Sequence, residues 1–490
     1  MFDGVLAQFG LEPDDAEALI REEASKNLSN IDFIALELAD WKDSKRRKEM
    51  LDGLGYYRYT VGPDIKQKLW GRDADGCPTY VTDESPRTLD NQYANLVDQK
   101  VNYMVGKPLT MQTNNDNYSA YLRQVFDKAF LRTIQRVTTG ALNEGLAWLM
   151  PYFNENGELQ FKMFPAHEIM PFWKNDEHTE LDMAVRFHLT VQYVGRTKTY
   201  IQHADVYYPD KVDRFILNNG TLTPNTEELD TTYGVDKQGN AFTWGKVPLV
   251  AFKYNTDEIP LIRRIKGLQD NLNKMRNNWN HSMSESVMDN ILVLRNYGGE
   301  NLSEFKRQLM QYGAVKVRDD GGVEVLRLDR DVASYTEYLK NTKKALIENG
   351  RGFDAKDDRV GKDPNEMNLR SMYSDIDLDT DMIEQQYQAA FDQLFYFVDI
   401  YLQMAGAGDF TNEEVTVTFN RNMIVNDAEI ISEIQQSQGL VSQETLLAHH
   451  PFVTDIQAEQ ERLKQEQQEQ MRQMLAYQMA GENNNADTGS

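Results

Sequence analysis

The fold of this chain is decided by residues 259–287, which read IPLIRRIKGLQDNLNKMRNNWNHSMSESV. Large apolar side chains recur every three or four positions here, at Leu261, Ile265, Leu268, Leu272, Met275, Trp279, Met283 and Val287. This spacing places them on one narrow stripe of an α-helix roughly 45 Å long, while charged side chains occupy the other faces. The stretch predicts a rod that packs along one side; a buried-face helix of an ordinary helical domain is the alternative.

A small module follows this rod and leads to a second one. Residues 291–294 predict a buried strand, residues 302–312 a helix, and residues 315–328 a β-hairpin. Residues 332–348 predict the second long helix, which Asn349-Gly350 ends in left-handed backbone. Two long helices with a compact module at one end are typical of subunits that stand side by side in an assembly.

The composition is that of a hydrophilic, acidic protein with a mean hydropathy of −0.62. The chain has 490 residues, of which 40% are hydrophobic, and its length allows roughly two to four domains. No apolar run is long enough to span a bilayer, and the N-terminus has no signal-peptide pattern. The single cysteine, Cys77, excludes an intrachain disulfide and a cysteine-based metal cluster, which fits a reducing cytoplasm.

The formal net charge of −25 limits contact with nucleic acid. A protein that grips DNA by its backbone needs a basic footprint, and this chain as a whole has none. Any DNA contact is therefore expected to be local and weak. The alternative is that the acidity only keeps the protein soluble.

The rest of the chain divides into helical ends and a sheet-rich middle, which makes the fold class α+β, mainly helical. Helices are expected over residues 14–27, 31–48, 91–105, 117–143, 367–404, 427–438, 442–449 and 455–479. Strands are expected over residues 146–153, 159–164, 183–191, 200–208, 212–217, 249–254 and 415–419. The basic run Lys45–Lys48 is expected to end the second helix, residues 51–88 to be turn-rich, and residues 481–490 to be disordered.

The chain shows no motif of a common enzyme class. It lacks the phosphate-binding GxxxxGK[ST] loop, HExxH, GxSxG and CxxC. His178, His188 and His203 fall on or near predicted strands, but their spacing gives no support for a shared zinc site. We therefore expect no catalytic residue, no metal and no cofactor.

One acidic stretch keeps a metal-dependent alternative open. It consists of Asp375, Asp377, Asp379 and Asp381. Alternate carboxylates of this kind could hold Ca²⁺ or Mg²⁺, and a nuclease would need them to converge in a pocket. The stretch fails as an EF-hand loop, because Thr380 and Gln386 stand where Gly and Glu are required. On a helix, residues two apart diverge, which favours a solvated acidic turn.

The order of the elements resembles the portal protein of tailed bacteriophages, of the siphophage type found in phages of Gram-positive hosts. The similar segments are GYYRY at 55–59, DI at 64–65, NQYANLVDQKVNYMVGKP at 91–108, the module at 291–326, VTFNRN at 417–422 and GLVSQET at 439–445. One departure precedes the long helix, where the family often has a Ser-Gly pair and this chain has Asn365-Glu366-Met367-Asn368. Together the segments cover most of the chain.

The resemblance implies a portal-like fold with long stem helices, a small α/β clip, a sheet-containing wing and a C-terminal helical crown. The implied boundaries are 1–256 for the wing, 257–289 for stem helix 1, 290–329 for the clip, 330–350 for stem helix 2, 351–366 for the tunnel loop, 367–410 for the long wing helix, 411–480 for the crown and 481–490 for the tail.

The resemblance also implies a function. Such proteins form a ring, usually of twelve subunits, that is a conduit for double-stranded DNA at one capsid vertex of the virion and is assembled in the host cytoplasm. The implied partners are the terminase large subunit, the head-completion adaptor, the major capsid and scaffolding proteins, and DNA held transiently and without sequence specificity; no membrane is implied. ATP hydrolysis belongs to the terminase, which agrees with the missing phosphate loop.

Two groups of site residues follow from the implied domains. The expected DNA-channel residues of the tunnel loop are Arg351, Lys356, Arg359 and Lys362. The expected docking residues of the clip, for the motor and the adaptor, are Arg295, Glu300, Lys306, Arg307, Arg318, Asp319 and Asp320. Two rival functions remain: a metal-dependent nuclease that uses the acidic stretch, and an acidic helical scaffold or adaptor without a channel.

Overall fold

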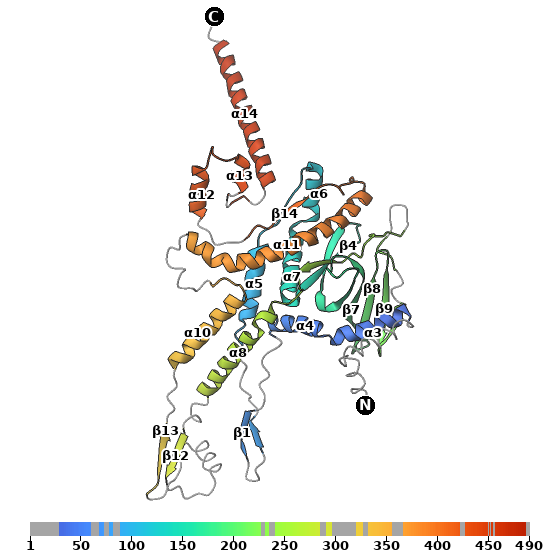
Figure 1. Cartoon of the computed structure of the whole chain (residues 1–490). Coiled ribbons are helices and arrows are strands. Elements are labelled where there is room, and N and C mark those ends of the chain that lie inside the picture. The colour runs from blue at the N-terminus through green and yellow to red at the C-terminus, as the bar shows by residue number, and fades with distance from the viewer. Residues whose placement is uncertain are drawn as a thin grey trace, which may run out of the picture. The chain divides into compact units, whose positions relative to one another are not determined.

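The computed structural model describes residues 29–59, 68–72, 78–81, 89–226, 231–234, 241–284, 291–295, 320–326, 332–354, 366–421, 427–448, 450, 452–453 and 456–486. The chain forms two compact units. Unit 1 comprises residues 1–54, 97–263 and 351–490, and unit 2 comprises residues 55–96 and 264–350. Figure 1 shows the elements of both units, which confirm the mixed, mainly helical fold class.

Two helices, α3 (Asn30–Asp43) and α4 (Lys45–Tyr57), open the described chain. The prediction of one helix over 31–48 is wrong, because Ser44 interrupts it: its hydroxyl donates to the Trp41 carbonyl and accepts from the Arg47 amide. The basic run therefore begins α4 instead of ending a helix. Arg47 is held against the protein by a 3.0 Å hydrogen bond to the His167 carbonyl oxygen.

Unit 1 contains two antiparallel sheets. The larger has the strand order β10-β9-β8-β7-β6 and the smaller the order β11-β4-β5. The strands are β4 (Leu146–Phe153), β5 (Leu159–Pro165), β6 (Ile169–Trp173), β7 (Leu181–Val194), β8 (Thr197–Tyr207), β9 (Val212–Asn218), β10 (Thr221–Pro224) and β11 (Val250–Lys253). The expected strands in this region are confirmed, whereas β6 and β10 were not predicted, because β6 contains Pro171 and β10 is only four residues long.

Helices cover the smaller sheet of unit 1, with α7 (Lys128–Glu144) packed on β4 and α11 (Glu366–Ala405) packed on β11. Phe252 of β11 meets Tyr387 and Phe391 of α11 edge-on, at centroid distances of 5.0 and 5.5 Å. The prediction of one helix over 117–143 is wrong. The chain breaks after α6 (Asp116–Val125), and Asp127 caps α7 by accepting from two backbone amides.

The end of the chain is helical, with α12 (Asp427–Gln436), α13 (Gln443–Ala448) and α14 (Ile456–Ala486). The expected disorder from residue 481 is therefore wrong for residues 481–486, which continue α14. A short ladder joins β3 (Thr110–Gln112) to β14 (Thr416–Thr418), which confirms the strand expected at 415–419. Across the described part of the chain, no helix has both the length and the apolar character needed to cross a membrane.

Unit 2 contains the predicted rods. They are α8 (Ile262–Ser284), whose first two residues belong to unit 1, and α10 (Val332–Asn349). Within unit 2 the two helices are joined by Trp279 and Tyr335, whose rings stack at 4.1 Å, and by a 2.8 Å hydrogen bond from Asn271 to the Tyr338 hydroxyl. The prediction of two long helices is confirmed, and they pack along one side as the apolar stripe indicated.

Between the rods, β12 (Ile291–Arg295) pairs antiparallel with β13 (Gly322–Leu326). The expected hairpin partner of β13, at residues 315–317, and the helix expected at 302–312 lie outside the described residues. Unit 2 also includes the ladder of β1 (Lys68–Arg72) with β2 (Pro78–Val81), in a region that was expected to be turn-rich. These strands were not predicted because they are short and contain Gly71 and Pro78, so they show no clear alternation of apolar and polar residues.

Candidate functional site

The predicted site residues fall largely outside the described part of the chain. Lys356, Arg359 and Lys362 of the tunnel loop and Glu300, Lys306, Arg307, Arg318 and Asp319 of the clip lie outside it. Arg295 ends β12 and Asp320 precedes β13, both in unit 2, whereas Arg351 lies in unit 1. The described side chains instead surround the start of the predicted tunnel loop, which is residues 351–354 with their partners on α5 (Gln92–Val105) and α11.

Two hydrogen bonds hold the backbone where the predicted tunnel loop begins. Gln99 on α5 donates to the carbonyl oxygen of Phe353 at 2.6 Å and accepts from the Phe353 amide at 2.8 Å. Two residues earlier, Arg351 has left-handed backbone with φ of +50°, which is uncommon for a residue with a side chain. The Gln99 side-chain amide thus satisfies both backbone groups of Phe353, as a neighbouring strand would, and fixes this turn.

A buried ion pair lies directly beneath this turn. The Lys100 ammonium is 2.7 Å from Oδ2 of Asp379 on α11 and also donates to the Arg351 carbonyl oxygen at 2.8 Å. The Tyr254 hydroxyl donates to the same Asp379 oxygen at 3.0 Å. The side chains of Lys100 and Asp379 are 1% and 3% exposed, so neither charge is solvated and each depends on these partners.

The Arg351 side chain turns toward α11. Its guanidinium lies 3.4 Å from Oδ1 of Asp379 and 3.4 Å from the sulfur of Met382, while about two fifths of the side chain stays exposed. A contact of this length is a weak hydrogen bond. Of the four cations predicted for the DNA channel, the one that is described is therefore partly neutralised at the base of the loop.

A second cluster holds the same part of α11 from the other side. Arg421 donates to Asp377 at 2.8 Å, to Glu384 at 3.0 Å and to Asp381, and the Tyr103 hydroxyl donates to Asp377. Burial alone would lower the pKa of Arg421, but the hydrogen bonds to these carboxylates outweigh it and raise the pKa. Arg421 therefore stays charged and neutralises much of the acidic stretch.

Three stacked rings complete the base of the loop. Tyr373 of α11 lies against Phe353 at a centroid distance of 4.3 Å and against Tyr103 of α5 at 5.5 Å. Met372 and Ile376 bury the same cluster. Phe353 at the start of the loop is thus held against α11 by aromatic packing and against α5 by the hydrogen bonds of Gln99.

Three carboxylates of the acidic stretch are engaged in ion pairs with cations of the same chain. Asp377 and Asp381 point to Arg421, Asp379 points to Lys100, and Asp375 is exposed. Among the described residues, no group of three or more His, Cys, Asp or Glu side chains is placed to hold a metal ion. The geometry therefore gives the nuclease alternative no support.

The three histidines considered above for a shared zinc site do not come together. His188 of β7 and His203 of β8 stack on each other at 5.2 Å, whereas His178 stacks on Trp173 at 4.9 Å. Burial, then the neighbouring Lys253 and Arg46 charges, lowers the pKa of His178, whose Nδ1 lies 3.0 Å from the buried Glu258. These rings pack as structural side chains of the sheet lobe.

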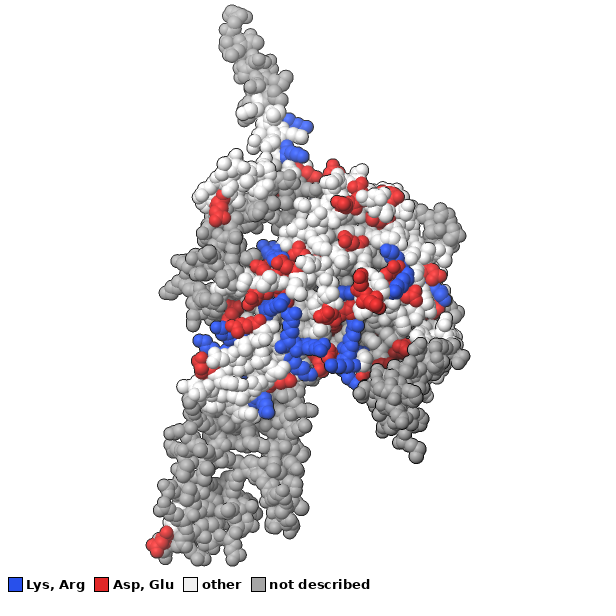
Figure 2. Space-filling view, in the orientation of Figure 1, with Lys and Arg blue, Asp and Glu red and all other residues white. Residues whose placement is uncertain are grey.

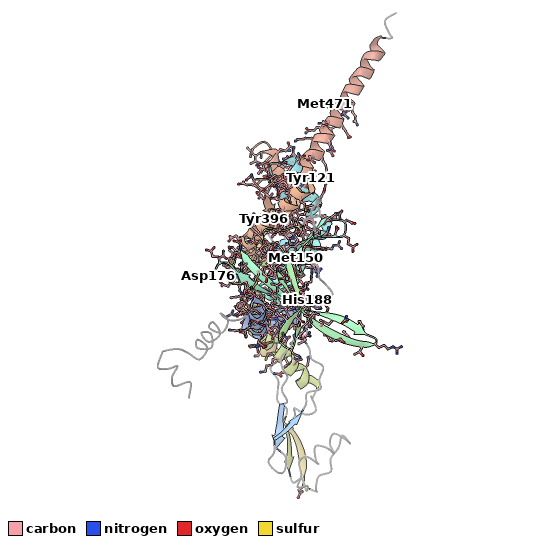
Figure 3. All side chains as sticks on the ribbon, turned by 90° about the vertical axis from the view of Figure 1, so that its right-hand side faces the viewer. Tyr121, Met150, Asp176, His188, Tyr396 and Met471 are labelled. Carbon is pink, nitrogen blue, oxygen red and sulfur yellow. The ribbon has the colours of Figure 1, made fainter. Side chains whose placement is uncertain are left out.

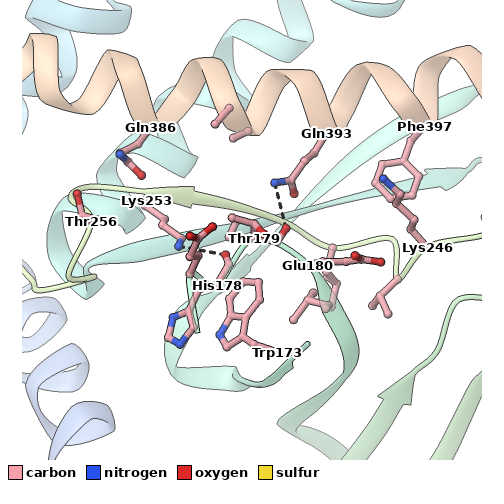
Figure 4. A pocket seen from close by; sticks show the side chains of 17 residues that line it. Trp173, His178, Thr179, Glu180, Lys246, Lys253, Thr256, Gln386, Gln393 and Phe397 are labelled. Atoms are coloured by element: carbon pink, nitrogen blue, oxygen red, sulfur yellow. Dashed lines mark hydrogen bonds between the residues drawn. The ribbon is translucent and has the colours of Figure 1, made fainter. Parts of the chain in front are cut away.

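A cavity of about 310 Å³ lies between α11 and the sheets of unit 1 (Figure 4). Gln386, Gln393 and Phe397 of α11 face Trp173 and Lys253 across it. Lys253 is engaged on its wall, 3.0 Å from Glu258 and 3.1 Å from the His178 carbonyl oxygen, and burial lowers its pKa. From α11, Gln393 crosses the cavity and donates a 3.3 Å hydrogen bond to the Thr179 carbonyl oxygen.

Charged side chains of both signs are interspersed on the face drawn in Figure 2. Sequence reasoning missed Gln99 and Lys100, although one signal was present. Lys100 shares the helical face of Tyr93, Val97 and Met104. A lysine therefore occupies a helix position where the periodicity predicts a buried apolar residue.

These features, two long paired helices with a small module between them, a sheet lobe and a braced loop base, define a structural subunit. The family model described as "Phage portal protein, SPP1 Gp6-like" matches residues 37–473. The chain belongs to this family of phage portal proteins and has the function of a portal. Portal proteins are in general structural components of the virion at the capsid vertex, without enzymatic activity.

Two curated relatives are similar over most of their length. The chain is 29% identical over 433 residues to the portal protein of Bacillus phage SPP1, which covers 86% of this chain and 84% of that one. It is 24% identical over 435 residues to the portal protein of Clostridium phage phiCD119, covering 85% and 92%. Among solved structures, a chain from the neck of a native GTA particle computed with C12 symmetry matches with a TM-score of 0.35 and 11% identity, covering 73% of this chain and 89% of that one.

Proposed function

We propose that this chain assembles into a closed ring of identical subunits, twelve in number, at one vertex of a phage capsid, and that double-stranded DNA passes through the ring during packaging and ejection. The family membership supports the proposal most strongly, since it spans residues 37–473. The β12–β13 pair between the long helices α8 and α10 supports it independently, because a subunit of this kind is typical of an assembly in which copies stand side by side.

Charge explains how DNA slides through such a ring. Twelve copies at −25 give 12 × −25 = −300 per ring. An acidic lining repels phosphate, whereas a basic one would release roughly one counterion for each phosphate contacted and would hold the strand. A small number of cations in the tunnel loop then provides transient contact without a lasting grip.

The tunnel loop is proposed to span residues 351–366, with Arg351, Lys356, Arg359 and Lys362 touching DNA. The bracing of Phe353 by Gln99 and of the Arg351 carbonyl by Lys100 supports this role. A loop that contacts a moving duplex transmits force to its base, so a base packed between α5 and α11 keeps the cations at a constant position in each subunit.

The remaining parts receive roles by the same proposal. Residues 1–256 and 367–410 form the wing, 257–289 and 330–350 the stem, and 411–480 the crown. The clip, residues 290–329, docks the terminase large subunit and later the head-completion adaptor through Arg295, Glu300, Lys306, Arg307, Arg318, Asp319 and Asp320. The wing and crown meet the major capsid and scaffolding proteins, the ring is assembled in the host cytoplasm, and the chain itself catalyses no reaction.

The test separates assembly from DNA handling. Replacing Lys356, Arg359 and Lys362 by Ala is expected to leave rings intact in particle images while DNA packaging or retention falls at least about tenfold. A matched control replaces three exposed cations of α14, Arg462, Lys464 and Arg472, by Ala, and is expected to package normally. Equal loss of rings and of packaging in the loop variant would assign the loop cations to structure and overturn their proposed role.

A further inference from the structure

The β7–β8 hairpin extends beyond the sheet to which it belongs. β6 pairs with β7 only over residues 181–186, and β9 pairs with β8 only over residues 203–207. Between these limits β7 and β8 pair only with each other among the described strands, up to the two-residue turn Gly195-Arg196. In Figure 3 this hairpin projects sideways from the body of unit 1, beyond the label of His188.

One face of the projecting hairpin is apolar. Leu189, Val191 and Tyr193 alternate along β7, and Tyr200 lies directly opposite Val191 on β8. Their exposed fractions are 57%, 46%, 67% and 59%. A two-stranded ribbon with no third strand is marginally stable in water, and four large side chains exposed on one face are typical of an interface. We call these four residues the hairpin stripe.

The hairpin also differs in charge from the rest of the chain. Residues 189–202 contain Arg196 and Lys198 and no Asp or Glu, so their charge is +2, and the remaining residues carry −25 − 2 = −27. Lys198 lies over the ring of Tyr200 at 4.8 Å, at the edge of the stripe. Two cations are too few for the footprint of a DNA-binding surface, which commonly contacts roughly six to ten phosphates.

We propose that the hairpin is an arm that docks on a second copy of this chain, with the stripe against an apolar patch and the basic tip against the acidic surface around it. The inference rests on the proposed ring. Charge complementarity selects this occupant, because a copy of the same chain presents a surface of strongly opposite sign. The contact is between two different surfaces, and such a head-to-tail contact closes into a ring when the rotation fits.

The experiment compares the oligomeric state of variants of the full chain, measured by native mass spectrometry and by particle images over a range of protein concentrations. One variant replaces Val191, Tyr193 and Tyr200 by Thr, which keeps β-propensity but removes three of the four side chains of the hairpin stripe. A second replaces residues 191–200 by Asn-Gly, which closes the hairpin at the pair Thr190–Ile201. The control replaces Gln192 and Thr199 by Ala on the opposite face of the same strands.

Both stripe variants are expected to fold, as judged by circular dichroism, and to need at least about tenfold more protein for half-assembly than the control. The double variant Arg196→Glu with Lys198→Glu is also expected to raise the protein concentration needed for half-assembly, and to raise it more at low salt. Rings at unchanged concentrations, or rings that fail only to enter capsids, would overturn the docking on a second copy. Absence of rings from the unaltered chain would instead contradict the proposed function.

Discussion

Lys100 and Asp379 form an ion pair of 2.7 Å although they lie 279 positions apart in the sequence. Both side chains are almost completely buried, and the lysine also holds the backbone at Arg351. A buried pair of this kind adds little stability compared with apolar residues of the same size, but removing one partner strands the other charge. Its position at the base of the predicted tunnel loop therefore favours a role in fixing the backbone geometry at Arg351.

The first prediction concerns this pair. Lys100→Met is expected to lower the free energy of unfolding by about 3–5 kcal/mol, because the buried Asp379 carboxylate loses the ammonium at 2.7 Å and keeps the weaker 3.4 Å contact with the Arg351 guanidinium. Denaturant unfolding followed by circular dichroism measures the change. The double variant with Asp379→Leu removes both charges and is expected to recover most of the loss. A single variant as stable as the parent would show that the pair is not buried in solution.

The second prediction concerns Arg421, which is hydrogen-bonded to three carboxylates. Arg421→Gln is expected to cost about 1–3 kcal/mol, since three acidic side chains on α11 are left to repel one another. Thermal melting in low and in high salt measures it, and salt is expected to reduce the difference. Arg462→Gln is the control, since its exposed pair with Glu459 should contribute about 0–1 kcal/mol.

The rods, most strands and the long helix α11 could be predicted from sequence, because each depends on local periodicity. The base of the tunnel loop could not. Gln99 and Phe353 are polar and aromatic residues in unrelated segments, and only the packing of α5 on α11 brings them together. The break at Ser44 was missed because the apolar periodicity continues across it. The Ser44 hydroxyl forms hydrogen bonds with nearby backbone groups, and these local bonds end one helix and begin the next. The clip and loop cations rested on family resemblance and stay predictions.

The third prediction concerns pH. Burial, followed by the charges of Arg186, His203 and Lys162, lowers the pKa of His188 to about 4, and the Asp205 carboxylate 3.7 Å away does not offset this. The unfolded chain, with an ordinary pKa near 6.5, then binds the proton more tightly than the folded one. The contribution of neutral His188 to the free energy of unfolding is fully present above about pH 6.5 and is lost as the pH falls toward 4.

The loss attributable to His188 is expected to reach up to about 3 kcal/mol below pH 4. Unfolding free energies measured from pH 7 to 4 for the parent and for His188→Gln give this value as the difference between the two losses of unfolding free energy over that range. Since the carboxylates titrate in both proteins, they cancel in the comparison. Identical slopes would show that His188 is solvated in the folded protein.

The fourth prediction addresses the nuclease alternative. Plasmid DNA incubated with the purified protein and Mg²⁺ or Mn²⁺ is expected to stay intact on a gel, because Asp377 and Asp381 are paired with Arg421 and Asp379 is paired with Lys100. The matched variant is Asp375→Asn with Asp381→Asn. Cleavage by the parent that disappears in this variant, while the fold is retained, would establish a metal site that the geometry does not support.

Rotational symmetry of the assembled particle tests the central claim most directly. Images of the purified protein and of the capsid vertex viewed along the particle axis are expected to show a closed ring of twelve subunits around an open channel. Filaments, symmetric dimers, or a monomer at every concentration with no ring in the virion would contradict the account.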